Sequence, residues 1–140
     1  MALQLTKGDV MATSVRDKCV GEDETILDAA RKMRARNVDA LPICSEDNRL
    51  RGVLTERDIV VRVLAAGKDP RLTRVAELVD GPSLALHADD SAARGLQAMV
   101  AHQVRRLPVV VDDDLLGVVS QDDLASALGS ERVSEFVAAA

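Results

Sequence analysis

Apolar and polar residues follow one another in a pattern that occurs twice along the chain, about 66 positions apart. The segment 38–43 reads Val-Asp-Ala-Leu-Pro-Ile, and the segment 104–109 reads Val-Arg-Arg-Leu-Pro-Val. Further on, Gly-Val-Leu-Thr-Glu-Arg-Asp at 52–58 matches Gly-Val-Val-Ser-Gln-Asp-Asp at 117–123. Because self-similarity at a fixed spacing is typical of repeat architectures, we expect two copies of one supersecondary unit.

Each copy is predicted to begin with a short strand and an amphipathic helix. The strands are expected at 18–20 and 84–86. The helices follow Thr25 and Ser91, whose hydroxyl groups suit the unpaired N–H groups of a helix start. The apolar positions of these helices recur at helical spacing and predict the buried faces: Ile26, Ala30 and Met33 in the first copy, Leu96 and Met99 in the second.

The remainder of each copy predicts a hairpin and a second helix. The Leu-Pro strand is followed by a polar turn, at 45–49 and at 112–114, and then by another apolar strand. The second helices are predicted at 56–66 and 121–128, and a glycine follows each. Each unit is therefore predicted as strand, helix, strand, strand, helix, which is an α/β (α+β) fold built from tandem repeats.

The repeat also predicts how the chain is divided. We expect the following segments: a first repeat at 9–67, a linker at 68–74, a second repeat at 75–132 and a C-terminal tail at 133–140.

Composition and charge narrow the function classes. The chain has 140 residues, of which 47% are hydrophobic, and a net charge of −5. An acidic chain has no excess cations to release counterions from nucleic acid, and its only aromatic residue, Phe136, provides no stacking platform for bases. No apolar run is long enough for a spanning helix, and the N-terminus lacks the pattern of a signal peptide. We therefore expect a cytoplasmic protein that binds neither nucleic acid nor membranes.

Together, these motifs resemble the CBS-domain pair, or Bateman module. The resemblance rests on the two Leu-Pro strands, the two Gly-apolar-apolar-Thr/Ser-x-x-Asp signatures and the Ala-Ala-Gly-Lys-Asp-Pro segment at 65–70, and it covers about 9–132. It implies a pseudo-twofold axis, two clefts for adenosyl ligands between the repeats, and a homodimer formed through helices. With no catalytic domain visible, the chain resembles a stand-alone pair that would signal to a protein partner.

The signature residues have two interpretations. Thr55 and Ser120 are predicted where a strand turns into a helix, whose N-terminus offers N–H donors and a partial positive charge to an anion. Asp58 and Asp123, three residues later, carry acceptor oxygens for both hydroxyls of a ribose, which is the use that the resemblance implies. The same spacing also forms a capping box, with Asp in place of the usual Glu or Gln. Both interpretations stay open.

The resemblance further implies that each cleft combines a signature from one repeat with the Leu-Pro strand of the other. One cleft would contain Thr55 and Asp58 together with Val104, Arg105 and Arg106. The other would contain Ser120 and Asp123 together with Val38, Asp39 and Ala40. Arg105 and Arg106 would attract a phosphate that Asp39 would repel, so we expect a phosphorylated ligand in the first cleft. The alternative is that both arginines form a solvated strand end.

The candidate ligands are AMP, ADP, ATP and S-adenosylmethionine, and no cofactor is required. No nucleophile with an adjacent His base, phosphate loop or dinucleotide fingerprint is present, so we predict that the chain is not an enzyme. A structural or interaction dimer without ligand is one alternative. Cys19 and Cys44 offer another, because two strand ends that border one cleft could bring the thiols together as a disulfide or zinc site. Their counterparts, Ala85 and Val110, favour small core residues instead.

Overall fold

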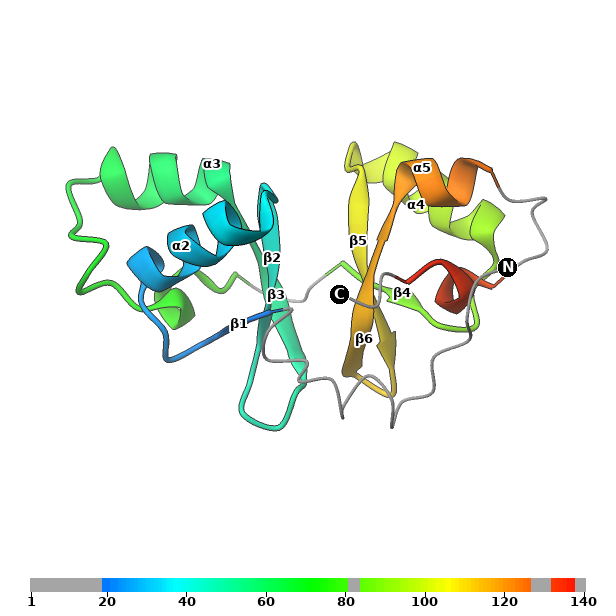
Figure 1. Cartoon of the computed structure of the whole chain (residues 1–140), viewed down its shortest axis with the longest axis horizontal. Helices are drawn as coiled ribbons and strands as arrows, with labels where there is room; N and C mark the ends of the chain where they lie inside the picture. The colour runs from blue at the N-terminus through cyan, green and yellow to red at the C-terminus, as the bar shows by residue number, and fades with distance from the viewer. Residues whose placement is uncertain (1–18, 81–83, 127–131, 138–140) are drawn as a thin grey trace. The chain divides into compact units, whose positions relative to one another are not determined.

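The protein is described by a computed structural model that covers residues 19–80, 84–126 and 132–137 (Figure 1). These residues form two compact units. We call residues 19–80 the first unit, and residues 84–126 with 132–137 the second unit. The predicted mixed fold of two similar halves is confirmed, with a three-stranded sheet in each unit.

The two sheets have the same topology. In the first unit, β1 (Val20–Gly21) pairs in parallel with β2 (Ala40–Cys44), which pairs antiparallel with β3 (Leu50–Thr55). Pro42 lies opposite Val53 of β3 and precedes the two residues of β2 that pair with β1. In both units the hairpin register shifts once, near the polar turn.

The second unit repeats this arrangement. Its strands are β4 (Leu86–His87), β5 (Arg106–Val111) and β6 (Asp114–Ser120), in the order β4-β5-β6. The first strand of each unit begins later than expected, at Val20 and Leu86, and Lys18 lies outside the described residues.

The first helix of each unit has the predicted cap. The helix α2 spans Ile26–Arg36 and α4 spans Ala92–His102. The Thr25 hydroxyl accepts from the N–H of Asp28 at 3.1 Å, and the Ser91 hydroxyl accepts from the N–H of Arg94 at 3.2 Å. Both helices end in a left-handed residue, Asn37 and Gln103, whose N–H bonds the last turn.

The buried face of these helices differs from the prediction by one position. The residues that face the core are Ile26, Ala29 and Met33 in α2, and Ala92, Gly95 and Met99 in α4. Ala30 and Leu96, which we expected there, are only half-buried. Spacings of three and four are both helical, and an alanine pair at 29 and 30 gives no size difference by which to choose between them.

In each second helix, the described residues that form a regular α-helix are fewer than predicted. In the first unit, α3 covers only Glu56–Asp58 and continues as a π-helix, η2 (Ile59–Leu64). In the second unit, α5 covers Gln121–Ala125, and the end of the predicted helix lies outside the described residues. Figure 1 shows α2 and α3 on one side of their sheet, and α4 and α5 likewise on one side of theirs.

The segment expected to open the second repeat packs instead in the first unit. The 3-10 helix η3 (Val75–Leu78) buries Val75 and Leu78 in the first core, and the N–H of Val75 donates to the carbonyl of Glu24 at 2.9 Å. Its counterpart in the second unit, η4 (Val133–Phe136), lies in the expected C-terminal tail. The apolar residues of each segment thus complete a core next to it, and the expected boundaries of the sequence repeats stay a prediction.

Candidate functional site

The candidate site of the first unit lies where β3 turns into α3, at Thr55 to Asp58. We call these four residues the first junction. Thr55 pairs with Ala40 across the hairpin, and the N–H of Glu56 donates to the carbonyl of Asp39 at 2.9 Å. The hairpin therefore fixes the junction beside the first residues of the Leu-Pro strand.

The first junction forms the capping box. The N–H of Asp58 donates to the Thr55 hydroxyl at 3.1 Å. In return, the Oδ2 atom of Asp58 accepts from the N–H and from the hydroxyl of Thr55, both at 2.9 Å. Its Oδ1 atom makes no hydrogen bond with the described residues and lies 4.0 Å from Nη1 of Arg62. The helix-cap interpretation is thus realised here, and one carboxylate oxygen is left as an acceptor.

The second junction, Ser120 to Asp123, has the same backbone but a different use of its carboxylate. Ser120 pairs with Arg106, and the N–H of Gln121 donates to the carbonyl of Arg105 at 2.7 Å. The Ser120 hydroxyl accepts from the N–H of Asp123 at 3.2 Å. Among the residues that the structure describes, none donates to the exposed carboxylate of Asp123.

The charges beside the two junctions are opposite. Asp39, which is exposed, precedes the strand that borders the first junction. Arg105 and Arg106, both exposed, stand at the corresponding place beside the second junction. Within each unit, the structure therefore brings Asp39 and Ala40 to Thr55, and Arg105 and Arg106 to Ser120. The expected combination of each junction with the strand of the other repeat stays a prediction.

Val38 and Val104, the remaining candidate residues, have a packing role within their units. Both are half-buried, and Val38 packs against the first hydrophobic core. Each lies directly after the left-handed residue that ends its helix, and its N–H bonds that helix, at 3.1 Å to Met33 and 3.0 Å to Met99. Their contact with a ligand stays a prediction.

The two cysteines meet in the first unit. Cys19 and Cys44 are free, buried side chains at neighbouring strand ends. A hydrogen bond with Cys44 lowers the pKa of the Cys19 thiol, and nearby Lys32 acts in the same direction. The same hydrogen bond and burial raise the pKa of Cys44 far above its usual range. Both thiols are free and buried, as the interpretation as small core residues expects, and the disulfide or zinc alternative stays a prediction.

Zinc ordinarily requires four ligands in a structural site, and the thiol pair supplies two. No group of three or more His, Cys, Asp or Glu side chains suited to a metal occurs among residues 19–80, 84–126 and 132–137. The described residues alone therefore do not complete a zinc site.

Arg62 lies near the first junction, outside the residues proposed to bind a ligand, and was not predicted. It lies four residues after Asp58, within reach of that carboxylate, and also donates to the carbonyl of Leu78 at 3.0 Å. The signal available in the sequence was the acid–base pair at helical spacing, whose counterpart in the second repeat is Ala127.

The repeated strand–turn–helix geometry agrees with the comparison against known families. The CBS-domain family model matches residues 8–65 and 75–130, more than half of the chain. The chain belongs to the CBS-domain family. Its two CBS domains confirm the resemblance seen in the two signatures.

The similarity to individual CBS proteins is extensive. Hypoxic response protein 1 of Mycobacterium tuberculosis is 42% identical over 134 residues, which is 96% of this chain and 92% of that protein. The CBS domain-containing protein YhcV of Bacillus subtilis is 38% identical over 84% of this chain and 81% of its own length.

A solved structure extends the comparison to the fold. The crystal structure of hypoxic response protein I with two coordinated zinc ions superposes with a TM-score of 0.72 at 45% identity, covering 79% of this chain and 89% of that one. None of the helices in the described part of this CBS protein is long and apolar enough to cross a membrane.

Proposed function

We propose that this CBS-domain protein is a non-enzymatic regulatory module that binds an adenosyl ligand between its two CBS repeats. The candidate ligands are AMP, ADP, ATP and S-adenosylmethionine. Occupancy would favour one arrangement of the repeats over another, and a protein partner would read that population shift. The module would act in the cytoplasm as a homodimer, and its acidic charge of −5 disfavours nucleic acid as the partner.

One observation carries the proposal: both junctions keep acceptor capacity after the helix has been capped. Asp58 uses Oδ2 for both cap bonds and leaves Oδ1 open, and no described residue donates to the carboxylate of Asp123. A helix cap alone needs neither open oxygen. Two ribose hydroxyls are suitable donors, because an ionised carboxylate accepts several charge-assisted hydrogen bonds.

The arginines suggest where an anionic part of the ligand would lie. Arg105 and Arg106 extend from the start of a strand and are exposed. Planar guanidinium groups bind phosphate through paired hydrogen bonds. We propose that they hold the phosphate of a ligand whose ribose is bound by Asp58, whereas the site of Asp123, with Asp39, suits a less anionic ligand.

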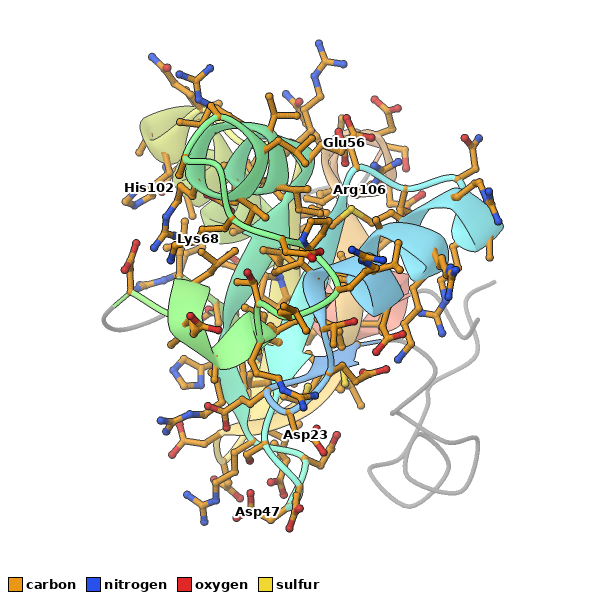
Figure 2. The ribbon with its side chains drawn as sticks, turned by 90° about the vertical axis from the view of Figure 1, so that its left-hand side faces the viewer. Asp23, Asp47, Glu56, Lys68, His102 and Arg106 are labelled. Atoms are coloured by element: carbon orange, nitrogen blue, oxygen red, sulfur yellow. The ribbon has the colours of Figure 1, made fainter. Side chains whose placement is uncertain are left out.

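Calorimetric titration with the four candidate ligands tests the proposal. Asp58→Asn and Asp123→Asn retain the shape of the side chains while removing the charge, and Asp47→Asn is the matched control. Asp47 and Glu56 lie at opposite ends of the β2–β3 hairpin, so the control is remote from the first junction (Figure 2).

We expect saturable binding of at least one ligand, weakened about tenfold or more in one or both junction variants, because a hydrogen bond to a charged group contributes about 1.5–3 kcal/mol. Asp47→Asn should bind like the unmodified protein. If none of the four ligands binds, the sensor proposal is overturned, and a stable dimer would then favour a structural or interaction role.

A second candidate, a zinc or thiol switch, is favoured by two buried free thiols at paired strands: Cys19 directly precedes β1, and Cys44 ends β2 opposite Gly21 of β1. Zinc would use both as thiolates and would need further ligands from outside the described residues or from a second copy. Native mass spectrometry before and after reduction and chelation tests this candidate. A mass that does not change, with both thiols freely alkylated, would rule it out.

A further inference from the structure

Arg62 connects the first junction with the chain that leaves the first unit. Its Nη1 atom donates to the carbonyl of Leu78 at 3.0 Å and lies 3.0 Å from Oδ2 of Asp80. Its Nη2 atom donates to Oδ1 of Asp80 at 3.3 Å. On the other side, Nη1 is 4.0 Å from Oδ1 of Asp58. One guanidinium group therefore stands between two carboxylates.

The distances show to which carboxylate Arg62 is bound. Nη1 carries two hydrogens, and the Leu78 carbonyl and Asp80 lie at hydrogen-bond distance from it, whereas Asp58 lies beyond that distance. The Oδ1 atom of Asp58 thus remains open because Arg62 is held elsewhere. If Asp80 lost its charge, Arg62 could close the gap and occupy the acceptor that a ribose hydroxyl requires.

The two ends of this contact have different surroundings. Asp58 is 28% exposed and Arg62 is 32% exposed, whereas Asp80 is 76% exposed. Leu78 is buried in the first core, and Asp80 is the last residue of the first unit. The contact between Arg62 and Asp80 therefore lies where the chain leaves the first unit towards the second repeat.

We propose that Arg62 is a shared cation that relays occupancy of the Asp58 site to the Leu78–Asp80 segment. This inference rests on the proposed function. A ligand that donates to Oδ1 of Asp58 excludes Arg62 from that oxygen and so strengthens its contact with Asp80. By linkage, the contact with Asp80 promotes ligand binding by the same factor. The second repeat has Ala127 at the corresponding position, so the relay belongs to the first repeat alone.

Asp80 touches no ligand in this scheme, which makes its substitution informative. The experiment is a calorimetric titration with whichever of AMP, ADP, ATP and S-adenosylmethionine binds the unmodified protein most tightly. The variants are Asp80→Asn, Arg62→Gln and the double variant. Asp69→Asn removes the same charge from a different ion pair, the one with Arg71, and is the matched control.

We expect Asp80→Asn to weaken binding about fivefold, at the lower end of the range for coupled sites because Asp80 is exposed. Arg62→Gln should not weaken binding, since it removes the competitor for Asp58. In the Arg62→Gln background, Asp80→Asn should have no further effect, and the control should bind like the unmodified protein. Ligand should also slow amide exchange at 78–80 in the unmodified protein but not in Arg62→Gln.

One set of results would overturn the relay alone, and another would overturn the proposed function as well. A loss of affinity from Asp80→Asn that persists in the Arg62→Gln background, or no loss at all while the ligand still binds, would overturn the relay and leave the proposed function intact. If the unmodified protein binds none of the four ligands, the proposed function is overturned and the relay with it.

Discussion

The two units of this CBS protein share a frame, by which we mean the capped helices and the hairpin, but differ at the junctions that we propose as ligand sites. Both have a capped helix, a hairpin with Leu-Pro in its first strand, and a Ser or Thr that caps the next helix. In the first unit the carboxylate of Asp58 accepts two hydrogen bonds from Thr55. In the second unit the carboxylate of Asp123 accepts none from the described residues. The comparison separates residues that the fold needs from residues that are available for recognition.

The difference extends to the core and to the charge beside each junction. Ala29 in the first unit corresponds to Gly95 in the second, and Asp39 corresponds to Arg105. Two similar frames therefore place opposite charges beside their junctions.

The same core substitution should lower the stability of the protein by a similar amount in either unit. Met33 and Met99 are buried at equivalent positions of α2 and α4. Replacing either with Ala should lower the free energy of unfolding by about 2–5 kcal/mol, because a cavity replaces buried side-chain volume. Chemical denaturation measures both losses. A large loss for one and none for the other would show that the frames are not equivalent.

Exchanging the small residues at the equivalent positions 29 and 95 should destabilise the protein for different reasons in the two units. A Cβ atom on Gly95 would lie 2.7 Å from Cδ1 of Leu124 and 3.2 Å from Cδ1 of Leu86, both buried side chains. Gly95→Ala should therefore destabilise the protein by about 1–2 kcal/mol, despite the better helix propensity of Ala. The reciprocal Ala29→Gly should lose about 1 kcal/mol through helix propensity, and more through the loss of its buried methyl group. Thermal unfolding compares them, and a stabilising Gly95→Ala would contradict the packing described for α4.

The junction carboxylates should contribute unequally to stability. Asp58→Ala removes the returned cap bonds and should destabilise the ligand-free protein by about 1 kcal/mol. Asp123→Ala removes no such bond and should change stability by about 0.5 kcal/mol or less. Urea titrations without nucleotide give both values. Equal losses would mean that Asp123 also supports its helix.

The smallest effect concerns pH. The N–H and then the hydroxyl of Thr25 hold the pKa of Asp28 below its ordinary value of 3.8. Since the folded-state pKa is the lower one, the contribution of Asp28 is fully present above pH 3.8 and is lost as the pH falls through the folded-state value. Asp28→Asn should flatten this part of the stability profile, measured between pH 5 and pH 2. Arg94 occupies the corresponding position of the second unit, so no such loss should arise there.

Local patterns in the sequence predicted most of the frame. Thr25 and Ser91 were recognisable as caps, and the Leu-Pro strands as hairpins, because each depends on neighbouring residues. The packing of Val75 in the first unit was not predicted, since an apolar residue near a boundary does not reveal which core it joins. The π-helix after Asp58 has no distinctive sequence signal either.

Of the candidate site, the sequence predicted where the junction residues lie, because the repeat fixes their place between strand and helix. The cleft assigned to each junction and the ligand roles stay predictions. The commitment of Asp58 to Thr55 depends on side-chain rotamers, and the position of Arg62 depends on the wider turn of the π-helix. Spacing in a sequence specifies neither of these.

The most direct test of the central claim is an amide NMR titration of the full chain with ATP and with S-adenosylmethionine. If the junctions bind adenosyl ligands, the resonances of Thr55 to Asp58, of Ser120 to Asp123, or of both should shift saturably, together with those of the strand residues at 38–40 or 104–106. Saturable shifts confined to other parts of the chain, or no shifts with either ligand, would contradict the claim.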